Sequence, residues 1–385
     1  MQTRLLKTKQ PFIVVAVFCL SLLSACGQVV PPTASASTDE AAIDAALVHY
    51  DAANYATAIT QLTAFKNNYP NSPYLDEAQY FIGRSTHELA YLESIAPIAT
   101  LNSLYTFDAA RVEYAKLIND PINNARKWAD DAQYQIGSTH FDEAMSKAAA
   151  LAVADYSSAV GAFDKVFAYT APSVGNSAQY YKARAIHRLA QIEQVAVTPT
   201  VDYPYTYDFA RAEYAKLLTP VNVRSDDAQY QIGMAHFDEG MGKAPNSADD
   251  LKLAVDEFHK VLAYADTPFA ADAQYYKARA THEWAAAQPN VLANFNLARD
   301  EYALVKNYLL NTWLDDAAYQ SALTYDDAED CAAELREMEQ FVMDYSLPTL
   351  SPLVADAQKH IDDLKLALAI PAGNFKDHKK CPRPV

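Results

Sequence analysis

One short phrase recurs along this chain, and it limits the fold more than any other feature. Five copies are built around Ala-Gln-Tyr, and a looser sixth copy follows near the C-terminus. The tyrosines of the phrase stand 54, 46, 50, 45 and 44 residues apart, at Tyr80, Tyr134, Tyr180, Tyr230, Tyr275 and Tyr319. Repetition at this period is typical of a solenoid, in which each unit is stable only when it is stacked on its neighbours.

The composition favours helices and argues against nucleic acid as a partner. Alanine is abundant, only nine of 385 residues are glycine, and strand-like alternating runs are absent. These features predict an all-α fold. The net charge is −17. Since a surface this acidic repels phosphate backbones, the expected partners are proteins and not nucleic acid.

The N-terminus has the pattern of an export signal. Three basic residues precede an apolar run from Phe12 to Leu23, which is too short to span a bilayer comfortably. The run ends in Leu-Ser-Ala before Cys26, a pattern that resembles the lipobox of bacterial lipoproteins. The resemblance implies a signal peptide over residues 1–25, lipidation of Cys26 and a flexible tether over 26–38. Gly27 after the cysteine then implies retention in the outer membrane, on its periplasmic side. The alternative is an ordinary signal peptide with an incidental cysteine.

Helical periodicity begins near Ala41 and alternates between two kinds of helix. The helix that carries the Ala-Gln-Tyr phrase is followed by one with Ala-x-x-x-Tyr/Phe, in five copies from Ala110/Tyr114 to Ala298/Tyr302. A small residue one turn before an aromatic ring lets neighbouring helices approach while the ring fills the groove. Residues 106–190 and 206–285 also align with each other as a tandem pair, which indicates duplication of a two-unit block.

These small and aromatic positions resemble tetratricopeptide repeats. The resemblance implies a right-handed superhelical solenoid of about seven helix pairs over residues 39–370. A capping helix from Pro352 is expected near its end, followed by a tail over 371–385. The inserts between paired helices are longer than the family's, which leaves the superhelical pitch open. The first complete unit further resembles the repeat lipoprotein of the β-barrel assembly machinery and the periplasmic coordinator associated with the Tol-Pal complex.

These resemblances imply a non-enzymatic scaffold, anchored in the membrane by lipid, that binds protein partners in outer-membrane assembly. A Tol-Pal-type or pilotin-type coordinator and a glycan- or peptidoglycan-capturing lipoprotein are the alternatives. No nucleotide-binding loop, nucleophile motif or metal-type spacing occurs in the sequence, so no catalytic residue, cofactor or metal is expected. The acid pairs that open several helices are interpreted as helix caps.

The repeated tyrosines, arginines and histidines give the candidate partner-binding residues. By the family's pattern they line the concave face, and Tyr and Arg are the residue types that dominate binding hot spots. The alternative is that each Arg pairs with a nearby acid and each Tyr is half-buried between units. The set is Tyr80, Arg84, His87, Tyr134, Tyr180, Arg184, His187, Tyr230, Tyr275, Arg279 and His282.

Two further sets of residues complete the predictions. By the same pattern, His140 and His236 occupy the aromatic packing position and are expected in the core. Cys331 and Cys381 remain after the signal peptide and lipid have taken the other two cysteines. In an oxidising compartment they could form a disulfide that pins the tail to the last repeat, or they could stay free thiols.

Overall fold

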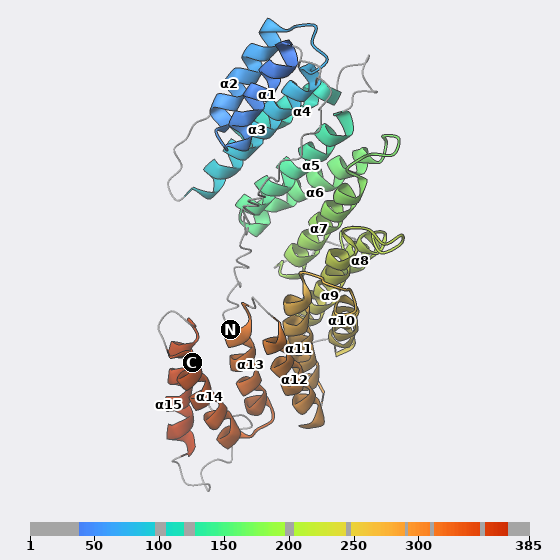
Figure 1. The fold of residues 1–385 in the computed structure, drawn as a ribbon. Coiled ribbons are helices and arrows are strands. Elements are labelled where there is room, and N and C mark those ends of the chain that lie inside the picture. The colour runs from blue at the N-terminus through green and yellow to red at the C-terminus, as the bar shows by residue number, and fades with distance from the viewer. Residues whose placement is uncertain are drawn as a thin grey trace, which may run out of the picture.

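A computed structural model describes residues 38–96, 105–118, 128–196, 204–243, 248–288, 292–308, 312–346 and 351–368. The described residues form α-helices, one short 3₁₀ segment and the turns between them, without a strand (Figure 1). The predicted signal peptide, Cys26, Cys381 and the predicted tail lie outside these ranges, as does the tether except for Thr38. No helix in the described part of the chain is long and apolar enough to cross a membrane.

The helices follow one another as consecutive pairs. Their bounds are α1 Thr38–Asp51, α2 Tyr55–Asn68, α3 Leu75–Ile95, α4 Phe107–Ile118, α5 Ala129–Ser146, α6 Ala149–Val166, α7 Gly175–Gln194, α8 Tyr207–Ala215, α9 Ser225–Gly242, α10 Ala248–Val261, α11 Ala270–Ala286, α12 Leu292–Leu304, η1 Val305–Asn307, α13 Leu314–Asp327, α14 Cys331–Tyr345 and α15 Val354–Leu368. The predicted all-α solenoid is confirmed, with seven pairs from α1/α2 to α13/α14 and α15 packed on α14 as the final helix.

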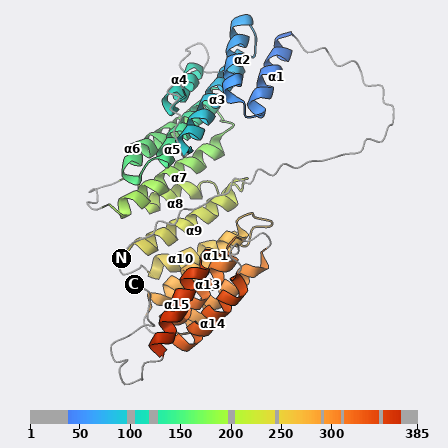
Figure 2. The same cartoon turned by 90° about the vertical axis from the view of Figure 1, so that its left-hand side faces the viewer.

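The pairs follow one another from α1 and α2 at one end to α14 and α15 at the other (Figures 1 and 2), and the last helices, α13 to α15, lie beside α11 and α12 (Figure 1). The first helix of each pair packs on its own second helix and also on the first helix of the next pair. Thus α1, α3, α5, α7, α9, α11 and α13 form a continuous layer, called here the first-helix layer. No second helix packs on the next second helix to a similar extent within the described ranges.

Each pair is closed by a small residue that faces an aromatic ring. Tyr114 and Phe163 on the second helices are fully buried, as are the alanines one turn before them. Gly83 and Gly137 lie opposite these rings on the first helices. A Cβ atom built at Gly137 would stand 2.5 Å from Phe163 Cε1, and one at Gly83 would stand 2.7 Å from the Tyr114 ring. The glycines therefore allow a helix-to-ring contact that a side chain would push apart.

In five of the seven pairs, from α3/α4 to α11/α12, a buried glutamine joins the two helices, and this bond is not predicted from the sequence. It is the glutamine of the Ala-Gln-Tyr phrase. In Gln79, Gln179 and Gln274 the Nε2 atom donates to the backbone carbonyl of the residue before the buried tyrosine, at 2.9–3.0 Å. Gln133 makes the same bond to Ala162, and Gln229 donates to the carboxylate of Glu257. A backbone carbonyl has two lone pairs and accepts one hydrogen bond within its own helix. It can therefore also accept the hydrogen bond of the glutamine without disrupting the helix.

We expect the substitution Gly137→Ala to destabilise the protein by about 1–2 kcal/mol, because the new methyl group must displace a buried ring. Gly161→Ala is the matched control, since a Cβ atom added at Gly161, on the exposed side of α6, would have no atom within 4 Å. It should stabilise the protein by about 0.5–1 kcal/mol through helix propensity. Urea unfolding followed by circular dichroism measures both changes. Equal effects of the two substitutions would contradict the packing argument.

Candidate partner-binding face

The repeated tyrosines of α3, α7 and α11 are packed between successive units. Tyr80, Tyr180 and Tyr275 are only 3–6% exposed. The Tyr80 ring stacks on Trp128 with centroids 4.6 Å apart, and Tyr275 stacks on Trp313 at 4.4 Å. The Tyr180 hydroxyl donates to Asp227 Oδ1 at 2.8 Å. These rings stabilise the stacking of units, and little of their surface is open to a partner.

Tyr134 and Tyr230, on the intervening first helices, are half-buried. Each ring lies close to the aromatic ring of its own second helix, Phe163 or Phe258, with centroids 5.7 Å apart. These two residues are the more exposed of the candidate tyrosines, and burial raises the pKa of Tyr134 above its usual value. Whether any of the candidate tyrosines binds a partner remains a prediction.

The repeated histidines join neighbouring first helices, at every second interface of the layer. Nε2 of His87 on α3 lies 3.1 Å from Asp142 of α5, and His187 on α7 lies 3.0 Å from Asp238 of α9. His282 on α11 makes the same contact with Asp327 of α13, at 3.0 Å. All three rings are buried. They act first as links between units, and their role in binding stays a prediction.

The repeated arginines lie at the other interfaces of the layer. The guanidinium of Arg84 lies 5.9 Å from the Tyr50 ring of α1, Arg184 lies 5.4 Å from Phe141 of α5, and Arg279 lies 5.9 Å from Phe237 of α9. Contacts of this kind between a cation and an aromatic face are attractive. The first-helix layer therefore alternates between two seams, one made by His–Asp contacts and one by Arg–aromatic contacts.

The three arginines differ in their ionic partners. Arg84 pairs with Glu88 at 3.2 Å, and Arg279 pairs with Glu283 at 3.4 Å. Arg188 occupies the position of these glutamates in α7. In the described part of the chain, no carboxylate oxygen lies within 4.0 Å of the guanidinium of Arg184 or Arg188. Arg188 donates to Gln191 Oε1 at 2.8 Å instead.

A third arginine joins them from the next unit. Arg224 is the residue before α9, a position taken by Trp128 before α5 and by Trp313 before α13. Its guanidinium lies 5.1 Å from the Tyr180 ring and 5.9 Å from the Tyr181 ring. Arg184 also lies 5.8 Å from each of these rings. Arg184, Arg188 and Arg224 are called here the arginine cluster.

Charge separates this cluster from the equivalent places in the other units. Arg84, Glu88 and Trp128 sum to zero, as do Arg279, Glu283 and Trp313, whereas the arginine cluster sums to +3. Asp227 lies 3.8 Å from Arg224. The two other places have an aspartate at the same position, Asp131 and Asp316, so the arginine cluster still exceeds each of them by three positive charges. Half-buried guanidinium groups beside aromatic rings are well suited to binding carboxylates of another molecule. Of this cluster, the sequence predicts Arg184 as a binding residue but not Arg188 or Arg224.

The expectation that His140 and His236 are core residues is wrong. Both are half-buried, and the residues that follow them, Phe141 and Phe237, fill the core in their place. One helical position is a rotation of about 100°, which moves each histidine to the flank of its helix. There each one joins two carboxylates of a neighbouring polar network.

Cys331 begins α14 directly after the capping residue Asp330, whose carboxylate accepts from the backbone N–H of Ala333. It is disulfide-bonded. Its partner lies outside the described residues, so pairing with Cys381 remains a prediction.

Comparison with known proteins leaves the family open. No protein-family model and no curated protein matches the sequence. Among solved structures, the C-terminal part of a TPR repeat-containing protein from Cytophaga hutchinsonii matches with a TM-score of 0.49 and 15% identity. The match covers 82% of this chain and 98% of the other. The assignment of the fold therefore rests on this chain's own helix pairs.

One acid of the layer should titrate near neutral pH. Burial raises the pKa of Asp316 to about 6, the neighbouring Asp315 adds to the rise, and Arg279 opposes it. Because the folded-state pKa lies above the unfolded value, the ionised group costs stability above about pH 6, and this cost disappears as the pH falls toward about 4. We expect Asp316→Asn to stabilise the protein by about 1–2 kcal/mol near pH 7.5, with only about a third of that gain left near pH 4.5.

Urea unfolding at the two pH values measures this difference. The control is Asp256→Asn, because the Asp256 side chain is 54% exposed and its carboxylate lies 3.4 Å from Lys252 on the same helix. It should change stability little at either pH. A gain for Asp316→Asn of the same size at both pH values would contradict the pKa argument.

Proposed function

We propose that this protein is a non-enzymatic, lipid-anchored scaffold of the cell envelope that binds protein partners along its first-helix layer. A stack of helix pairs offers a long continuous surface and few enclosed sites, which suits recognition of extended protein segments. Chemistry on small molecules needs a concave, well-formed pocket with converging polar groups. The part of the chain that the structure describes offers an extended face instead.

The arginine cluster is the observation that carries the proposal. With Asp227 included, the cluster sums to +2 in a chain with a net charge of −17, and two of its three arginines have no carboxylate at ion-pair distance among the described residues. Arginines held between aromatic rings are enriched at binding hot spots because little side-chain entropy is lost on contact. The partner segment that fits this place presents carboxylates.

The cellular setting of the proposal comes from the sequence. Cys26 in its lipobox-like context supports a lipid anchor, and the repeat resemblance supports assembly of outer-membrane β-barrel proteins as the process served. A Tol-Pal-type or pilotin-type coordinator is the rival assignment within the same binding class. A glycan-binding lipoprotein is the rival of a different class.

The test is a crosslinked pull-down from membranes, read by mass spectrometry. It compares the wild type with Cys26→Ala and with the double substitution Arg184→Gln and Arg188→Gln. The matched control is Arg336→Gln, since the Arg336 side chain is 70% exposed on α14 and away from the cluster. We expect the double variant to lose partner capture at least about tenfold, a loss of about 1.4 kcal/mol or more, while the control retains it.

The outcomes separate the assignments. Enrichment of β-barrel assembly components that depends on Cys26 supports the proposed process, and recovery of Tol-Pal or pilus components supports the rival coordinator. Binding to purified peptidoglycan without protein capture supports the glycan rival. Unchanged capture by the double variant, with its helical content intact, overturns the role of the arginine cluster.

A further inference from the structure

Two matching polar clusters lie away from the first-helix seams, at the ends of α5 and α9. In one, His140 and Glu143 stand one turn apart on α5 and Asp155 joins them from α6. In the other, His236 and Glu239 stand on α9 and Asp250 joins them from α10. Within each cluster the ligand atoms of the three side chains all lie within 4.8 Å of one another. Metal sites in helical pairs are built in this way, with two ligands one turn apart and another from the facing helix.

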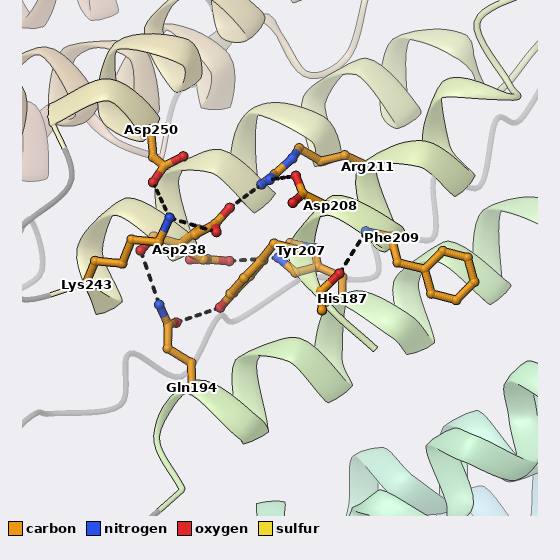
Figure 3. A network of polar contacts seen from close by, with 11 residues as sticks. His187, Gln194, Tyr207, Asp208, Phe209, Arg211, Asp238, Lys243 and Asp250 are labelled. Atoms are coloured by element: carbon orange, nitrogen blue, oxygen red, sulfur yellow. Dashed lines mark hydrogen bonds and ion pairs between the residues drawn. The ribbon is translucent and has the colours of Figure 1, made fainter. Parts of the chain in front are cut away.

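A lysine ammonium sits between the carboxylates in each cluster. Lys147 Nζ lies 2.8 Å from Glu143 Oε1 and 2.6 Å from Asp155 Oδ2. Lys243 Nζ lies 2.9 Å from Glu239 Oε1 and 2.7 Å from Asp250 Oδ2. Figure 3 shows Lys243 reaching toward Asp250 in the second cluster. The carboxylates thus already hold a cation at the point where a metal ion would bind.

The lysines are the most exposed members of the clusters. The side chains of Lys147 and Lys243 are 34% and 49% exposed, against 13–19% for the four carboxylates. Both lysines are the residues that follow the last turn of their helices. Because a lysine head on a long stem is well hydrated when it turns outward, leaving the cluster costs it little.

The net charge favours a divalent ion over the ammonium. On its other side each glutamate contacts an arginine, Arg111 at 2.8 Å or Arg211 at 2.7 Å. That arginine also pairs with an aspartate, Asp108 or Asp208. In each cluster three carboxylates face one arginine and one lysine, which leaves a net charge of −1. Replacing the single charge of the ammonium by a double charge brings the net charge to zero.

The histidines supply an independent sign of a missing ligand. Nδ1 of His140 and Nδ1 of His236 are shielded from solvent and have no hydrogen-bond partner in the described residues. A buried polar atom without a partner in two equivalent places points to an ion or water that would satisfy it.

We propose that each cluster is a site for a divalent metal ion of the zinc class, which binds His140, Glu143 and Asp155, or His236, Glu239 and Asp250, in place of the lysine ammonium. The imidazole nitrogen favours zinc over calcium and magnesium, which prefer all-oxygen ligands. No metal is expected from the sequence, since these ligands come from two helices and follow no metal-binding spacing. The proposal is independent of the partner-binding function.

The test uses the full chain after treatment with a chelator, titrated with Zn²⁺ alone. Native mass spectrometry gives the number of ions bound, and competition with a chromogenic chelator gives the affinity. The wild type is expected to bind two zinc ions, and the double substitution His140→Gln and His236→Gln is expected to lose both. His259→Gln is the matched control, because His259 is exposed on α10 outside both clusters, and it should bind as the wild type does.

A second variant tests the exchange of lysine for metal without removing a ligand. Lys147→Met with Lys243→Met removes the competing ammonium, so zinc should bind at least about tenfold more tightly. Circular dichroism checks that each variant is folded. Zinc binding that is unchanged by the histidine substitutions, or no binding by both the wild type and the lysine variant, overturns the proposal. Equal zinc affinity of the wild type and the lysine variant would show that the metal ion does not replace the lysine ammonium.

Discussion

The fold depends on the contact between an aromatic ring of each second helix and a small residue of its first helix. Where Tyr114, Phe163 and Phe258 meet Gly83, Gly137 and Gly233, the ring fills the space that a side chain would take. This contact sets the distance within a pair, and the glutamine bonds to the same segment fix how one helix is placed along the other. Because these contacts recur from pair to pair, residues repeated in the sequence make repeated contacts along the first-helix layer.

The stacking itself uses two kinds of interaction in turn. The His–Asp seams join α3 to α5, α7 to α9 and α11 to α13. The Arg–aromatic seams join α1 to α3, α5 to α7 and α9 to α11. Most of the repeated polar residues serve these seams, and their partners lie within the chain. Where the pattern changes, as at Arg188, the described surface gains a positive charge that has no carboxylate at ion-pair distance among the described residues.

The sequence predicts the helix pairs and their number because buried small and aromatic positions recur at helical spacing. It does not predict the bonds of Gln79 and its equivalents, since a glutamine in a helix has the same pattern whether it faces solvent or a neighbouring carbonyl. His140 is wrongly assigned to the core because the core position is the next residue, Phe141, and one residue along a helix turns the side chain from the core to the flank. Arg224 and Trp128 are recognised as equivalent only from their places before α9 and α5.

The alternation of seams also restricts how this chain can change in length. A first helix with a His–Asp seam on one side has an Arg–aromatic seam on the other, so a unit is not interchangeable with its neighbour. Loss or gain of a single pair would set a buried histidine such as His187 against a helix that has no aspartate for it, or an arginine against a helix without its ring. Removal or addition of four helices together leaves every seam matched. The genetic unit of this solenoid is therefore two pairs, although its structural unit is one.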